Sequence, residues 1–182
     1  MATHNRRIST HEEYIQAFKD NKRIWIDDEF NRKDSGQCGK CIDRAIHPDA
    51  TSQKGADVVG VAETKAKEHG NLSGTIEICS FVKTRSKKEG LEEAFEKIKD
   101  GLGIVTYKIG KGIHSHVNPI IGEMSIEKDC LDLVELHLYR KCIPGLFKMN
   151  AKIISKSDNS KKVQLRLGDI KKCFESYEVI TL

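Results

Sequence analysis

Hydrophobic and polar positions alternate along much of this chain, and that alternation predicts strands. The clearest case is 75–83, where Val82 falls on the same face as the preceding isoleucines and Phe81 falls on the opposite face. Short apolar or alternating runs predict further strands at 24–26, 57–63, 104–109, 134–139, 147–153 and 163–167. Polar stretches, many with glycine, predict loops or turns at 27–37, 71–74, 119–127 and 155–160.

Helices are predicted where a capping box precedes apolar residues at helical spacing. Ser9 and Glu12 open a helix over 10–20. Ser86 and Glu89 open a second helix, whose apolar stripe is Leu91, Ala94, Phe95 and Ile98 and whose left-handed stop is Gly101. Asp169 can cap a short third helix that carries Ile170, Cys173, Phe174 and Tyr177.

Strands joined by hairpins, together with two or three packed helices, predict an α+β fold with a single domain built on an antiparallel sheet. Within it, 1–70 is expected to form an N-terminal arm and subdomain, and 71–182 the α+β core domain with a basic C-terminal quarter. The composition agrees, since 38% of the 182 residues are hydrophobic and 14 glycines with three prolines are too few for a disordered chain.

The apolar runs and the cysteine spacing also predict where the protein is located and whether it binds a metal ion. The apolar runs are far shorter than the roughly 20 residues that span a bilayer. The first residues lack the apolar core of a signal peptide, which predicts a cytosolic or nuclear protein with its six cysteines reduced. Cys38 and Cys41 have the spacing of half a zinc site, but only His47 lies nearby, so we interpret them as loop thiols and predict no metal or cofactor.

Positive charge is concentrated at the C-terminal end. The net charge is +4, and residues 140–182 hold ten basic against four acidic side chains. Such a run attracts the phosphates of RNA or of an anionic membrane surface; the alternative is a solvated sheet edge protected by lysines. The residues expected to bind RNA or anionic lipid are Lys148, Lys152, Lys156, Lys161, Lys162, Arg166, Lys171 and Lys172.

One short motif suggests an enzyme. Asp49 follows a proline, and Glu63 and Lys65 follow an apolar run, an order that resembles the PD-(D/E)xK nucleases. In that case Asp49 and Glu63 would hold Mg²⁺ and Lys65 would orient or activate the attacking water. The alternative is a solvated turn at Asp49 and a strand-end ion pair between Glu63 and Lys65.

A second resemblance lies in the order of the elements over 75–175. A strand and basic turn lead into a helix over 76–98, and a later segment, 139–154, carries Gly145-Leu146-Phe147-Lys148 at the entry to an expected long strand. This order resembles the core of rhabdovirus matrix proteins, and the length suits their plant-infecting members. The chain differs from the animal members in having neither a Pro-Pro-x-Tyr motif nor a long, lysine-dense N-terminal tail.

The matrix resemblance implies a structural protein without catalytic residues. Such a protein would self-associate and bridge the ribonucleoprotein nucleocapsid to the inner face of the envelope membrane through a basic surface. It would be found in the virion beneath the envelope, and in the host cytoplasm or nucleus. A nucleic-acid-binding or partner-binding module unrelated to either family is the third interpretation of the sequence.

Overall fold

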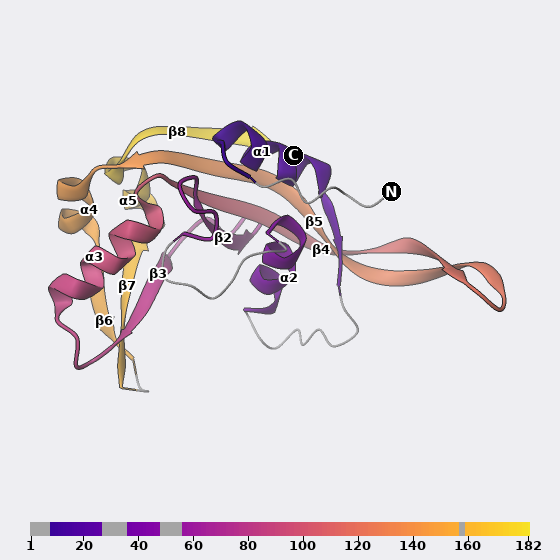
Figure 1. Ribbon diagram of the computed structural model, residues 1–182, viewed down its shortest axis with the longest axis horizontal. Coiled ribbons are helices and arrows are strands. Elements are labelled where there is room, and N and C mark those ends of the chain that lie inside the picture. Colours follow the sequence, from indigo (N-terminus) through magenta and orange to yellow (C-terminus); the bar gives the residue numbers. More distant parts are fainter. Residues whose placement is uncertain (1–7, 27–35, 48–55, 157–158) are drawn as a thin grey trace.

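Strands of this protein form two sheets in the computed structural model, which describes residues 8–26, 36–47, 56–156 and 159–182 (Figure 1). The larger sheet contains β1 (Arg23–Trp25), β2 (Glu63–Glu68), β4 (Gly101–Asn118), β5 (Gly122–Cys142) and β8 (Phe174–Thr181). The smaller sheet contains β3 (Thr75–Val82), β6 (Lys152–Ser155) and β7 (Ser160–Arg166).

The pairing of these strands is antiparallel except for β2, which runs parallel to β4. In the larger sheet the order is β1-β5-β4-β2, and β8 pairs with β5 further along the edge that β1 occupies. The smaller sheet has the order β3-β7-β6. The predicted single α+β domain with a mainly antiparallel sheet is therefore confirmed.

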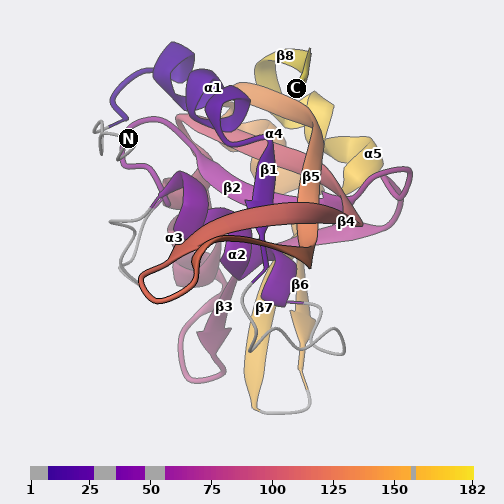
Figure 2. The ribbon, with the colours of Figure 1, turned by 90° about the vertical axis from the view of Figure 1, so that its right-hand side faces the viewer.

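The helices cover the sheets on two sides, and each side has its own hydrophobic core. The helices are α1 (His11–Asp20), α2 (Gln37–Ile46), α3 (Lys87–Ile98), α4 (Pro144–Asn150) and α5 (Leu167–Ile170), the last continuing into a 3₁₀ turn at Lys171–Cys173. The first core packs α1 and α2 against the larger sheet, with Tyr14 and Phe18 fully buried. The second core lies around α3 and the smaller sheet, with Ile98 and Phe147 fully buried. Both views show α1 at one end and the hairpin of β6 and β7 at the other (Figures 1 and 2).

Side-chain caps start two of the helices. Ser86 accepts a hydrogen bond from the backbone N–H of Glu89 at 3.1 Å, as predicted for α3. At α1 the cap is Thr10, which accepts from the N–H of Glu13, so the prediction of Ser9 was wrong by one residue. Within the described segments, no helix has both the length and the apolarity to cross a bilayer.

Gly101 was wrongly predicted to be a helix stop. It begins β4, and a Cβ at this position would lie 2.4 Å from the carbonyl oxygen of Val61. Close backbone approach, rather than a left-handed conformation, therefore requires the glycine.

A β-bulge in β3 changes which side chains face the core. The register with β7 shifts between Glu77 and Cys79, so the alternation is interrupted there. Phe81 is consequently buried, whereas 56% of the Val82 surface is exposed. The predicted strand is confirmed, but the predicted faces of its last two apolar residues are reversed.

Several other predicted boundaries were wrong. The expected strand at 57–63 is a tight turn closed by a Val58–Ala62 bridge, in which Gly60 has a φ of 77°, and β2 begins only at Glu63. The expected loop at 119–127 is mostly strand, because β4 and β5 extend to a turn at 119–121.

The C-terminal quarter differs most from expectation. The predicted strand at 147–153 begins as helix α4, with Pro144 in its first turn and Phe147 on its buried side, which leaves only the four-residue β6 as strand. The Gly145–Lys148 step therefore lies in a helix and does not enter a long strand. The predicted helix after Asp169 ends at Cys173, and the chain then forms β8.

Cys38 and Cys41 were wrongly interpreted as loop thiols. They lie on α2, where both are buried in the first core. All six cysteines are free and buried, so burial explains why they are tolerated as thiols.

Candidate functional site

Cationic side chains gather on the polar face of the smaller sheet. In antiparallel pairing, residues directly opposite each other share a face, and so do residues two apart on one strand. Arg166 lies opposite Thr75, Lys162 lies opposite Ile154, and Lys152 lies opposite Gln164, which places all three cations on one side. We call Lys152, Lys156, Lys162 and Arg166 the basic face. The other side of β7 carries apolar residues of the second core, including Val163 and Leu165.

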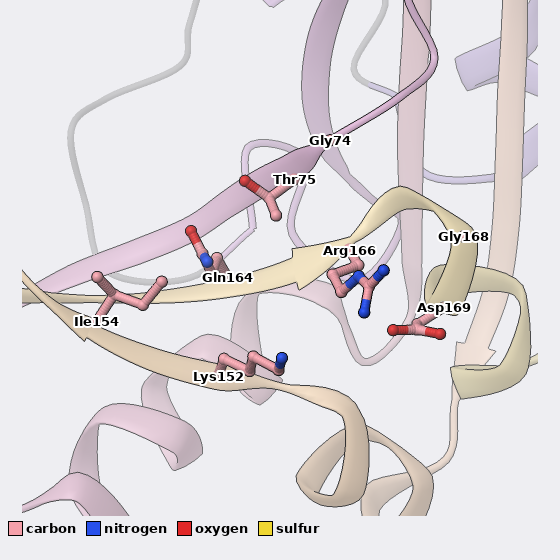
Figure 3. A pocket seen from close by; sticks show the side chains of 8 residues that line it. All are labelled: Gly74, Thr75, Lys152, Ile154, Gln164, Arg166, Gly168 and Asp169. Carbon is pink, nitrogen blue, oxygen red and sulfur yellow. The ribbon is translucent and has the colours of Figure 1, made fainter.

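A hollow of about 480 Å³ lies along the basic face (Figure 3). Lys152 and Arg166 enter it from neighbouring strands, and Asp169 lies at one end of it on α5. The residues that line it are Gly74, Thr75, Lys152, Ile154, Gln164, Arg166, Gly168 and Asp169. Hydroxyl, amide, guanidinium and ammonium groups in one concavity can hydrogen-bond a phosphate and neutralise its charge.

The cations of the basic face differ in their partners. Lys156 crosses to β3, where its Nζ donates to Glu77 Oε1 at 2.8 Å and to Ser80 Oγ at 2.7 Å. In the described part of the chain, Lys152, Lys162 and Arg166 form no ion pair. These three charges are therefore available to a bound anion.

Glu77 and Asp169 are acidic residues beside these cations, and Glu77 stays ionised. Burial raises the pKa of Glu77, but the hydrogen bonds from Lys156 and Ser80 and the charge of Lys162 outweigh burial and lower the pKa overall. Glu77 is hydrogen-bonded to Lys156, so its charge is balanced mainly by that residue and only in part by Lys162.

The other predicted phosphate-binding residues lie elsewhere. Lys161 is on the core side of β7, opposite Phe81, and Lys148 is on α4. In the 3₁₀ turn, Lys171 Nζ lies 5.5 Å from the ring centre of Tyr177, and Lys172 Nζ donates to Asp169 at 3.1 Å. The structure thus brings together four of the eight residues proposed from sequence. Sequence reasoning missed Thr75 and Gln164, although their alternation with core residues placed them on the polar side of their strands.

The residues of the nuclease motif lie away from the basic face. Asp49 lies outside the described residues. Glu63 begins β2, and its carboxyl lies beside that of Asp57, which accepts the backbone N–H of Thr64 at 2.9 Å. Sequence reasoning did not include Asp57 in the site, because Asp57 precedes the tight turn and Glu63 follows it. The feature that could have revealed it is its position six residues before Glu63.

Burial dominates the chemistry of Glu63. Only 3% of the residue is exposed, and this burial, followed by the nearby Asp57, raises the pKa of Glu63 to about 8. Lys97 Nζ is 4.0 Å from Glu63 Oε2, whereas Lys65 Nζ donates to the carbonyl of Ile78 at 3.5 Å. The expected pairing of Glu63 with Lys65 is therefore replaced by a contact with Lys97.

A metal centre would need more ligands than this pair provides. Among the residues that the structure describes, no group of three His, Cys, Asp or Glu side chains is placed to hold a metal ion. The neighbouring Asp43 has a pKa raised to about 7, first by burial and then by the charge of Asp57, with Lys65 acting in the opposite direction. The described residues thus form a buried, proton-binding carboxyl cluster and do not fit a Mg²⁺ site.

Comparison with known proteins adds no assignment, because no family model and no curated protein matches the chain.

Proposed function

We propose that this protein is a viral matrix protein, a structural protein that self-associates and bridges a ribonucleoprotein nucleocapsid to the anionic inner face of the envelope membrane. The observation that carries the proposal is the set of cations Lys152, Lys162 and Arg166, which form no ion pair among the described residues and lie along a hollow. The order of elements over 75–98, strand, basic turn and helix, agrees with the resemblance to rhabdovirus matrix proteins. The protein would act in the virion beneath the envelope and in the host cytoplasm or nucleus.

RNA is the phosphate ligand that suits the basic face best. Lys162 and Arg166 are four residues apart on one strand, so their Cα atoms are about 13 Å apart along it. A row of cations over a concave surface can follow a flexible, linear polyanion such as single-stranded RNA. Lipid headgroups lie in a plane, and a hollow meets a plane only at its rim.

We expect the triple variant Lys152→Gln, Lys162→Gln and Arg166→Gln to bind single-stranded RNA more weakly than the wild type at low salt. Each phosphate contact contributes about −0.7 to the slope of log affinity against log salt, so losing three should make that slope shallower by about 2. Fluorescence anisotropy with a labelled single-stranded RNA over a salt series measures both quantities.

The control is the triple variant Lys19→Gln, Lys87→Gln and Lys88→Gln. It removes the same charge from exposed positions on α1 and α3. Equal weakening by both triples would mean that net charge alone governs binding. If only binding to acidic vesicles changes, the basic face is a lipid site.

The sequence also suggested a metal-dependent nuclease, which would have to use the adjoining carboxyls of Asp57 and Glu63 although their burial does not suit a Mg²⁺ site. We expect RNA and DNA to stay intact when the purified protein is incubated with Mg²⁺ or Mn²⁺. Cleavage that Glu63→Gln abolishes, while the exposed Glu68→Gln on the same strand retains it, would replace the matrix proposal by the nuclease.

A further inference from the structure

The hairpin of β4 and β5 extends well beyond the rest of the larger sheet. The pairing of β2 with β4 ends at Tyr107, and the pairing of β1 with β5 covers only Cys130 to Asp132. Figure 1 shows the remainder of the hairpin, which we call the arm (residues 108–129), projecting away from the other elements. Within the described residues, no strand pairs with the outer edge that β4 forms in the arm, so this edge presents unpaired backbone N–H and C=O groups, whereas on the β5 edge Ile26 N–H donates to the carbonyl of Asp129 at 3.1 Å.

The edge formed by β4 also carries exposed apolar side chains. Ile109, Ile113 and Val117 are 42%, 65% and 80% exposed, and because they are spaced by four residues they share one face of the arm. The opposite face is partly covered, since Trp25 of β1 packs against His114 with ring centres 4.7 Å apart. This face of the edge is thus open, and its apolar side chains alternate with Lys111 and Ser115.

We propose that the β4 edge of the arm, from Lys108 to Asn118, pairs antiparallel with the same edge of a second copy of this chain, about a twofold axis at Ile113. The two larger sheets would then form one continuous sheet across the axis. This proposal rests on the self-association contained in the proposed function, and it names the surface responsible.

The side chains select this register. With the axis at Ile113, Ile109 lies opposite Val117 of the second copy, and Ile113 lies opposite itself. Lys111 lies opposite Ser115, and Lys108 lies opposite Asn118, so no like charges meet. All eleven residues of the edge are paired, and six β-branched side chains form three apolar cross-strand pairs that alternate with the Lys111–Ser115 pairs.

Neighbouring registers of the same edge are worse. An axis at Lys111 would place two lysines directly opposite each other, which is destabilising. An axis one residue to either side of Ile113 would place Lys111 opposite Ile113 or opposite Val117 and would shorten the pairing.

The β5 edge of the arm is disfavoured by its charges. An axis at Ser125 would oppose Glu123 with Glu127, an axis at Ile126 would oppose Glu123 with Asp129, and an axis at Glu127 would oppose that residue with itself. Charge therefore favours the β4 edge as the surface that pairs with a second copy. A single strand edge buries less than the roughly 1,200 Å² of a stable interface, so we expect a reversible dimer that forms as concentration rises.

Analytical ultracentrifugation over a concentration series tests the proposal with two matched variants. Ile113→Lys places two lysines face to face at the axis and should give a monomer at concentrations where the wild type dimerises. Ile126→Lys makes the same change at an exposed position on the β5 strand of the arm and should still dimerise.

Spin labels test the register itself. All six natural cysteines are buried, so labels attach to introduced cysteines. Labels at Ile113→Cys should lie next to each other across the axis, whereas labels at Val117→Cys should be separated by eight residues, or about 27 Å along the strands. Pulsed and continuous-wave electron paramagnetic resonance distinguish the two cases.

A wild type that stays monomeric, two lysine variants that dimerise alike, or equal label separations at both positions would overturn the edge pairing. RNA binding by the same samples reports on the proposed function independently, because the basic face lies on the other sheet.

Discussion

Replacing Gly103 with alanine is expected to lower the free energy of unfolding by about 3–5 kcal/mol, the sum of an overpacked site and a disturbed buried hydrogen bond. A Cβ on Gly103 would lie 2.2 Å from Tyr14 Oη. Tyr14 is fully buried, and its Oη is hydrogen-bonded to Thr64 Oγ1 at 2.7 Å, while His47 Nε2 is bonded to the same hydroxyl at 3.0 Å. Because Phe18 packs edge-on against the Tyr14 ring, the ring has no free space to enter. Denaturant unfolding of both proteins measures the loss.

Gly39→Ala is the matched control for this prediction. Gly39 lies in α2, and nothing would come within 4 Å of its Cβ, so alanine should raise stability by about 0.5–1 kcal/mol. Adding Tyr14→Phe to Gly103→Ala should recover part of the loss, because it removes the atom that clashes. If the stability that the double variant loses is at least the sum of the losses in Gly103→Ala and Tyr14→Phe, the contact with Tyr14 is not the cause.

Stability is expected to fall as pH rises from about 5 to 9, by an amount on the order of a few kcal/mol. The folded protein holds the pKa of Glu63 near 8 instead of 4.5, so the native state keeps a proton that the unfolded chain releases above pH 4.5. This contribution is complete below pH 4.5 and is lost as pH rises through 8. The pKa of Asp43, raised from 3.8 to about 7, acts in the same direction at lower pH. Urea unfolding at intervals of pH measures the slope.

Glu63→Gln should remove the pH dependence above pH 7, because glutamine keeps a neutral donor beside Asp57 but cannot ionise. Asp43 would leave a slope of similar size below pH 7. Glu68→Gln, at the exposed end of the same strand, should leave the slope of the wild type unchanged. Parallel curves for the wild type and Glu63→Gln would show that Glu63 is ionised in the folded protein.

Local chemistry explains which elements could be predicted from sequence. Helix α3 was predicted with its cap because Ser86, Glu89 and the apolar stripe all act within a few residues. Helix α4 was missed because the seven residues of alternation over 147–153 outweighed Pro144, which marks a first helical turn. The bulge in β3 was missed because a shift in pairing depends on the partner strand and leaves no mark in a single strand's alternation.

The long hairpin was predicted too short because its glycines serve a tertiary contact that the sequence does not show. The strand predicted at 104–109 stops before Gly110 and Gly112, yet β4 continues through both of them. A Cβ on Gly112 would lie 2.8 Å from Arg23 Nη1 and 3.0 Å from the Trp25 ring, so the glycine makes room for β1. The residues next to Gly112 in the sequence do not indicate its contact with Arg23 and Trp25, which lie far away in the chain.

The candidate site was predictable only in part, and for the same reason. Alternation along β7 placed Arg166 on a polar face, but the pairing of Lys156 with Glu77 joins residues 79 apart in sequence. Burial of Glu63 depends on elements packed from several parts of the chain. Its raised pKa therefore could not be read from the motif in which it was noticed.

The pairing of β1 with β5 has a consequence for synthesis on the ribosome. Arg23 pairs with Asp132, 109 residues later, so the first strand has no partner until most of the chain has emerged. At translation rates of about 5–20 residues per second, this interval is roughly 5–20 s. Throughout that time α1 carries Tyr14 and Phe18 without the sheet that buries them in the finished protein. The N-terminal helix of the nascent chain thus keeps its apolar side chains exposed during this interval, which makes it a site where a chaperone can bind.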